Sequence, residues 1–129
     1  MKTLLFDLDG TLTILSEFPD LRLLIPKQDL LFLKGFYSFG LVTASPKMEA
    51  LKALRQLSIY SLFERDIIIT SEDTAQGKES GEPFLLAKSR AVSIVAMIGD
   101  STADQTGSSI AGIPFISAQT LSVERLAYW

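Results

Sequence analysis

Five short stretches of the chain consist mostly of large apolar residues, and longer polar or mixed segments separate them. Each stretch is rich in branched or aromatic side chains and does not alternate between apolar and polar positions. Such runs are typical of strands that are buried on both faces, as in a parallel sheet. The predicted strands cover residues 3–8, 39–44, 66–71, 94–100 and 113–117.

Helical periodicity is found between these runs. We expect Ser45 to cap a helix over residues 46–58, with Pro46 in its first position. Pro83 is expected in the first turn of a second helix, and Thr102 and Gly112 are expected to cap and close a third. The apolar stripe of the first helix comprises Met48, Leu51, Leu54 and Leu57. The other predicted helices cover residues 26–35, 82–91, 102–112 and 121–128.

Strands that alternate with helices indicate βαβ units with right-handed crossovers. We therefore predict one α/β domain over residues 1–129, a Rossmann-like three-layer sandwich around a mainly parallel five-stranded sheet. Sites in such sheets form at the carboxyl ends of the strands. Three predicted strands end near a polar residue, namely Asp7, Thr43 and Asp100.

Composition narrows the chemistry that this sheet edge can support. The 129 residues include no cysteine and no histidine, so thiolate and imidazole ligands are absent and a metal site must use oxygen donors. This favours magnesium or calcium. A net charge of −3 does not fit a nucleic-acid binder, and no apolar run is long enough for a membrane span. We expect a cytoplasmic protein that binds neither nucleic acid nor membrane.

Two pairs of acids stand out in the sequence. Asp7 and Asp9 flank the end of the first strand, and Gly10 allows both carboxylates to converge there; the alternative is two solvated loop acids. Asp100 ends the fourth strand, and Asp104 lies in the next helix, where the helix dipole alone could explain an acid. A calcium loop is excluded because Leu12 and Phe18 stand where its glycine and glutamate would be.

Thr43 and Lys78 are the candidates for binding an anion. Thr43 precedes a helix start, where free backbone amides bind anions, although capping by Ser45 explains the same pattern. Lys78 lies in a long polar loop and could simply be solvated; Lys88, within a predicted helix, is an alternative functional lysine. The segment is not a P-loop, because Glu72 replaces the required glycine.

The motifs occur in the order FDLDGTLT, LVTAS, a lysine before a helix, and IGDSTAD. In this order the chain resembles the haloacid dehalogenase (HAD) superfamily, from about Lys2 to Phe115. The lysine motif departs from the family pattern, because relatives often have GKP where this chain has GKESGEP. The resemblance implies a hydrolase, a phosphoric monoesterase that depends on Mg²⁺.

The resemblance also implies a role for each motif residue. Asp7 would be the nucleophile that forms an aspartyl-phosphate, and Asp9 the general acid and base. Thr11 would orient Asp9 by a hydrogen bond. Thr43, with the backbone amide of Ala44, would hold the phosphate, while Lys78 would neutralise its charge. Asp7, the backbone carbonyl of Asp9 and Asp100 would bind Mg²⁺, with Asp104 supporting the ion or orienting Lys78.

No cap domain is expected, because positions 10–42 leave room only for a short flap over residues 14–26 and one helix. The flap is unusually apolar for a loop, which suggests either an interface in a homo-oligomer or packing on the protein's own core. A bulky substrate would be another way to cover the site. The apolar residues concerned are Phe18, Leu21, Leu23, Leu24 and Ile25, together with Tyr128 and Trp129 at the tail.

Two other classes of protein remain to be weighed. A two-component receiver also surrounds a phospho-aspartate with acids, a threonine and a lysine, but its acceptor aspartate lies mid-chain. A non-catalytic module could keep the same fold without turnover. A phosphomutase would need a cap to retain its intermediate. The sequence contains no signature of a particular phosphorylated substrate.

Overall fold

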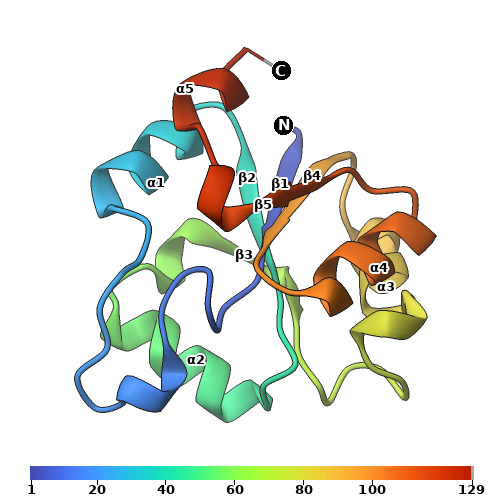
Figure 1. Ribbon diagram of the computed structural model, residues 1–129, viewed down its shortest axis with the longest axis horizontal. Helices are drawn as coiled ribbons and strands as arrows, with labels where there is room; N and C mark the ends of the chain where they lie inside the picture. The colour runs from blue at the N-terminus through green and yellow to red at the C-terminus, as the bar shows by residue number, and fades with distance from the viewer. Residues whose placement is uncertain (129) are drawn as a thin grey trace.

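The computed structural model describes residues 1–128, which form a central parallel sheet of five strands between two layers of helices (Figure 1). The strand order β3-β2-β1-β4-β5 confirms the Rossmann-like prediction. A receiver has its strands in the order 2-1-3-4-5, so that alternative is wrong. The strands are β1 (Thr3–Phe6), β2 (Ser38–Val42), β3 (Phe63–Ile69), β4 (Ile94–Gly99) and β5 (Phe115–Ser117).

Alternate residues of each strand face opposite helix layers. On β1, Leu4 and Phe6 belong to the core beneath α1, α2 and α5, whereas Leu5 belongs to the core beneath α3 and α4. Both sets of side chains are fully buried, as expected for a parallel sheet covered on both faces. The helices are α1 (Lys27–Lys34), α2 (Lys47–Gln56), α3 (Glu82–Arg90), α4 (Thr102–Ile110) and α5 (Val123–Leu126). Single 3-10 turns are η1 (Leu15–Glu17), η2 (Tyr60–Leu62), η3 (Lys78–Ser80) and η4 (Ala118–Thr120).

Two of the predicted helix caps are wrong. The N-cap of α2 is Pro46, not Ser45, and the side chain of Glu72 accepts a hydrogen bond from the Lys47 amide at 2.9 Å. This distant carboxylate satisfies an amide that a neighbouring serine would otherwise bind. The N-cap of α4 is Ser101 rather than Thr102, because Ser101 forms a capping box with Asp104. The predicted ends were confirmed at Pro83, in the first turn of α3, and at Gly112, with φ +73° after α4.

The flap, residues 14–26, contains η1 and lies beside α2 (Figure 1). The interface hypothesis requires the apolar residues of the flap to form one exposed cluster, and they do not. Ile25 is buried in the core, and Leu21 and Leu23 are partly buried and pack against that core. Phe18 and Leu24 are exposed, and so is Tyr128 at the tail; Trp129 lies outside the described residues.

No separate cap domain is present among residues 1–128, as the spacing of the motifs predicted. The connection between β1 and β2 consists of the turn at residues 7–13, the flap, α1 and a short turn at residues 35–37. Within the same residues, no helix combines the length and the apolar character needed to cross a membrane.

Candidate active site

Polar residues follow four neighbouring strands at one edge of the sheet. Asp7 comes directly after β1, Thr43 after β2, Thr70 after β3 and Asp100 after β4. The backbone still holds the first two of these positions, since the Asp7 amide donates to the Ile98 carbonyl and the Thr43 amide donates to the Ile69 carbonyl, each at 2.9 Å. The side chains therefore emerge from a rigid part of the fold.

Lys78 joins two of the acids at this edge. Its ammonium group donates to Asp7 Oδ1 and to Asp104 Oδ1, each at 2.6 Å, and the lysine side chain is buried. The turn η3 reaches this depth because Gly107 on α4 has no side chain: a Cβ there would lie 2.0 Å from the Lys78 carbonyl oxygen. Lys88, the alternative lysine, is exposed and donates to the Ala111 carbonyl after α4. The structure thus brings Lys78, and not Lys88, beside Asp7.

Asp104 is fully buried, and both of its oxygens are engaged. While Oδ1 binds Lys78, Oδ2 accepts hydrogen bonds from the backbone amides of Asp100 and Ser101 at 3.3 and 3.4 Å. The carboxylate fits there because Gly99 leaves space, as a Cβ at Gly99 would lie 2.5 Å from Asp104 Oδ2. Asp104 therefore completes the capping box of α4 and fixes the lysine at the same time.

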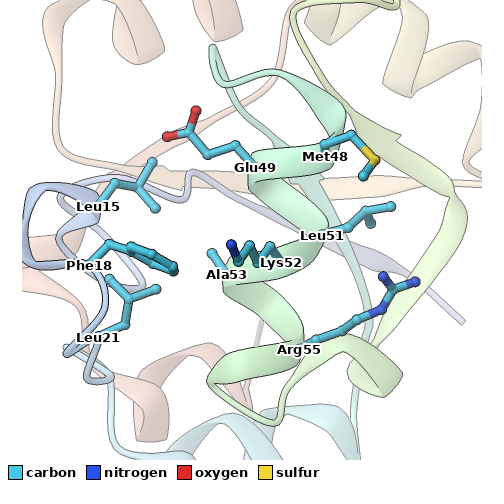
Figure 2. A pocket seen from close by; sticks show the side chains of 9 residues that line it. All are labelled: Leu15, Phe18, Leu21, Met48, Glu49, Leu51, Lys52, Ala53 and Arg55. Atoms are coloured by element: carbon cyan, nitrogen blue, oxygen red, sulfur yellow. The ribbon is translucent and has the colours of Figure 1, made fainter.

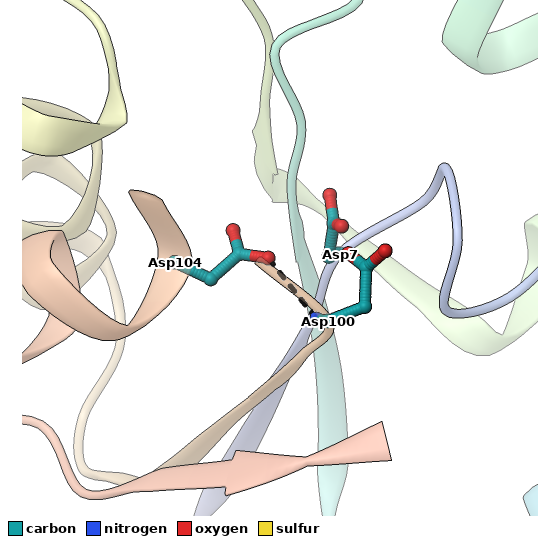
Figure 3. A group of neighbouring side chains, drawn as sticks. All are labelled: Asp7, Asp100 and Asp104. Carbon is teal, nitrogen blue, oxygen red and sulfur yellow. Dashed lines mark hydrogen bonds between the residues drawn. The ribbon is translucent and has the colours of Figure 1, made fainter. Parts of the chain in front are cut away.

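Asp100 completes a group of three carboxylates with Asp7 and Asp104 (Figure 3). One oxygen from each lies within 4.8 Å of the others. Asp100 is exposed and packs over Gly10, where φ is +84° and a Cβ would lie 2.0 Å from Asp100 Oδ2. Three carboxylates against one lysine leave an excess of negative charge, and hard oxygen donors suit Mg²⁺ or Ca²⁺. The donor set therefore fits a divalent cation.

Asp9 lies at the base of the flap, with an exposed side chain that is not part of this group of three. Its Oδ1 accepts a hydrogen bond from the Leu15 amide at 2.9 Å. The predicted hydrogen bond from Thr11 to Asp9 is wrong here, because Thr11 Oγ1 is buried and has no partner among the described residues. A backbone amide orients Asp9 instead, and the sequence contains no sign of such a contact.

Burial shapes the electrostatics of this site. It raises the pKa of Asp7 from 3.8 to about 7; the Lys78 ammonium lowers that pKa, whereas the charge of Asp104 raises it further. Burial by itself would lower the pKa of Lys78, but the facing carboxylates of Asp7 and Asp104 raise it above its ordinary value of 10.5. Lys78 therefore stays charged, while Asp7 can hold or release a proton near neutral pH.

A small cavity of about 190 Å³ opens between Thr43 and Lys78. Thr43 is buried, and its Oγ1 accepts a hydrogen bond from the Ser45 amide at 3.1 Å. Ala44 lines the same cavity, as the prediction of a phosphate pocket requires. The sequence analysis did not predict four other polar residues that line this cavity, namely Thr70, Ser71, Thr74 and Gln76. Thr70 could have been found, because it is a hydroxyl residue near the end of a predicted strand.

Comparison with known proteins identifies the family. The family model described as "Haloacid dehalogenase-like hydrolase" matches residues 30–118, a stretch that includes Thr43, Lys78, Asp100 and Asp104. This chain therefore belongs to the haloacid dehalogenase-like hydrolase family. None of the curated proteins matches it.

Solved structures share the fold at low sequence identity. An assigned beta-phosphoglucomutase from Thermotoga maritima has a TM-score of 0.74 and 19% identity, with 98% of this chain and 91% of that chain covered. An assigned haloacid dehalogenase-like hydrolase from Bacteroides fragilis has a TM-score of 0.74 and 19% identity, with 99% and 93% covered. The core domain of an assigned phosphoglycolate phosphatase from Streptococcus pneumoniae TIGR4 has a TM-score of 0.62 and 22% identity, with 95% and 81% covered.

Proposed function

We propose that this protein is a Mg²⁺-dependent phosphatase that hydrolyses phosphate monoesters through an aspartyl-phosphate on Asp7. The observation that supports it most is the Lys78 ammonium, buried and bonded to both Asp7 and Asp104 at the carboxyl edge of the sheet. An isolated buried charge is costly, so a buried lysine between two acids marks a site built for charge. Thr43 across the cavity supplies a hydroxyl for the transferred group.

In the first step, a carboxylate oxygen of Asp7 attacks phosphorus while the bond from phosphorus to the ester oxygen breaks. Because Lys78 holds Oδ1, we assign the attack to Oδ2. Asp9 gives its proton to the departing alkoxide, which leaves as the alcohol. Thr43, the Ala44 amide and Lys78 stabilise the negative charge on the transferred oxygens.

In the second step, Asp9 takes a proton from water as the water oxygen attacks phosphorus. The bond from phosphorus to Asp7 breaks, inorganic phosphate leaves, and both carboxylates return to their starting forms. Asp7, Asp100 and the Asp9 carbonyl would hold Mg²⁺, supported by Asp104, and the ion would neutralise the excess negative charge that otherwise repels phosphate.

Hydrolysis fits this chain better than phosphoryl transfer between sugars. One structural neighbour is an assigned mutase and another is the core of an assigned phosphatase. A mutase must keep water away from its phospho-enzyme, and no cap domain is present among residues 1–128 to do so. The aspartyl-phosphate of this protein would therefore meet water.

The metal requirement tests the proposal. Chelation should abolish release of phosphate from a generic aryl phosphate, and added Mg²⁺ should restore it. Asp100→Ala should raise the Mg²⁺ concentration needed by about tenfold or more, because Asp100 is the solvent-exposed member of the three carboxylates whose oxygens lie within 4.8 Å of one another.

Asp104→Asn is the matched variant, since both Asp104 oxygens already bind protein groups. It should raise the Mg²⁺ requirement less than Asp100→Ala does. The reverse ranking would show that Asp104 is the direct ligand, and a folded, metal-loaded protein without phosphatase activity would leave the non-catalytic module as the better description.

A further inference from the structure

A groove of about 660 Å³ lies between the flap and the outer face of α2 (Figure 2). Leu15, Phe18 and Leu21 form its flap side, and Glu49 and Ala53 of α2 lie towards them (Figure 2). The groove continues over the helix to Met48, Leu51 and Arg55 on its other side. We call it the flap groove. It is separate from the cavity between Thr43 and Lys78, since the two have no lining residue in common.

Apolar side chains of the flap groove are exposed to water, although the solvent-facing surface of a helix is usually polar. Met48 is 80% exposed and Phe18 is 48% exposed. Met48, Leu51, Lys52 and Arg55 have the i, i+3, i+4, i+7 spacing of one helix face. This face therefore combines an apolar surface with two cations.

The two cations are not neutralised by acids. Lys52 Nζ lies 4.7 Å from the centroid of the Phe18 ring, and the Arg55 guanidinium lies 4.9 Å from that of Tyr60. Neither forms an ion pair within residues 1–128. The single acid of the lining, Glu49, is in the first turn of α2, so the positive charge lies towards the other end of the helix.

One residue of the groove lining also contacts Asp9. The Leu15 amide binds Asp9 Oδ1, and the Leu15 side chain lines the groove. On the opposite wall, Met48 and Glu49 follow closely after the Thr43–Pro46 turn. The groove thus extends from the side of Asp9, where the leaving group departs, whereas Lys78 and Thr43 occupy the phosphate side.

We propose that the flap groove binds the alcohol half of the substrate, and that the substrates are phosphate monoesters of apolar alcohols with a second anionic group at the far end. This rests on the proposed phosphatase function. The volume is within the range of small-molecule sites, about 300–1,000 Å³. Along α2, Met48 and Arg55 are about 10 Å apart, the distance over which the apolar part would lie before the anion meets Lys52 or Arg55.

A series of n-alkyl phosphates, kept below their micellar concentrations, tests the apolar part. Full burial of a methylene would raise kcat/KM about fourfold. Because the groove leaves one side of the alkyl chain in water, we expect a rise of about twofold per added methylene. Phe18→Ser should reduce this dependence on length. Phe32→Ser is the matched control, because Phe32 is 47% exposed on α1 and does not line the groove.

Alkyl phosphates with and without a terminal carboxylate test the second anion. The carboxylate should raise kcat/KM by about threefold or more in the wild type, and Lys52→Ala should remove that gain while Lys27→Ala, on α1, should keep it. An active phosphatase with flat responses to both chain length and carboxylate would overturn the groove assignment alone. No hydrolysis of any ester by the Mg²⁺-loaded protein would overturn the phosphatase proposal itself, and with it the groove assignment.

Discussion

At the scale of single residues, the burial of Asp7 disfavours its ionised form. The carboxylate is buried and its pKa is raised to about 7, although Lys78 binds it at 2.6 Å. A group with a folded pKa above its unfolded value of 3.8 binds a proton more tightly in the folded protein. This stabilisation is fully present below about pH 4 and disappears as the pH rises through 7.

We therefore predict that Asp7→Asn stabilises the metal-free protein relative to the wild type by an amount that grows between pH 4.5 and 8. The difference should reach at most a few kcal/mol, because one pKa unit corresponds to about 1.4 kcal/mol and Lys78 loses an ionic partner in the variant. Thermal unfolding in a chelator measures it. Asp20→Asn, at an exposed flap position, is the control and should show no such pH dependence. A difference that shrinks as the pH rises would contradict the raised pKa of Asp7.

At the scale of elements, the start of α4 connects folding to the site. Ser101 accepts from the Asp104 amide at 3.2 Å, and Asp104 Oδ2 accepts from the Ser101 amide at 3.4 Å. The same aspartate fixes Lys78. A local capping motif thus determines where the lysine meets Asp7.

Ser101→Ala should lower the free energy of unfolding by about 1 kcal/mol, the usual effect of losing an N-cap side chain. Thr102→Ala should change it by only a few tenths, because Thr102 is the first helical residue and its exposed side chain makes no capping hydrogen bond. Urea denaturation of both variants distinguishes them. If Thr102→Ala were the more destabilising, the cap would be at Thr102, as the sequence alone suggested.

The elements also show where prediction from sequence ends. All five strands were predicted, because apolar runs of strand length are a direct consequence of burial on both faces. The start of β3 was missed by three residues: it begins at Phe63, and Glu64, Arg65 and Asp66 are exposed because β3 is an edge strand. A rule that searches for apolar runs detects only the buried end of such a strand.

The same limit applies to the site. The convergence of Asp7, Thr43 and Asp100 was predictable, because parallel strands end at one edge of the sheet. The sequence alone could not decide between Lys78 and Lys88, since that choice depends on how closely η3 approaches Gly107. Two further contacts could not be predicted for the same reason. Glu72 binds the first amide of α2 from a distant segment, and a backbone amide, that of Leu15, orients Asp9.

At the scale of the whole molecule, the main question is what covers a site without a cap. Leu21, Leu23 and Ile25 pack on the protein's own core, which leaves Phe18 and Leu24 as the exposed apolar residues of the flap. A homo-oligomer remains a prediction from the sequence, and a substrate that fills the flap groove is the alternative we favour.

Sizing by light scattering at micromolar concentration separates these two arrangements. Occupation of the groove by substrate predicts a monomer, because Phe18 and Leu24 are the only large apolar side chains of the flap, residues 14–26, that are exposed. A dimer that Leu24→Asp converts to a folded monomer would instead show that a second subunit covers the flap. Leu24 is preferable to Leu23 for this test, since Leu23 contributes to the core packing.

The central claim is that Asp7 accepts the phosphoryl group, and acid-quenched peptide mass spectrometry tests it most directly. The Asp9→Asn variant is mixed with Mg²⁺ and an aryl phosphate, whose good leaving group needs no proton, and is quenched during turnover. Loss of base catalysis should slow hydrolysis of the intermediate by about 10²–10⁴-fold, so that it accumulates. The account predicts a phosphoryl adduct on Asp7 that is absent when Asp7→Asn is added. An adduct on another residue, or undiminished turnover by a folded Asp7→Asn variant, would contradict it.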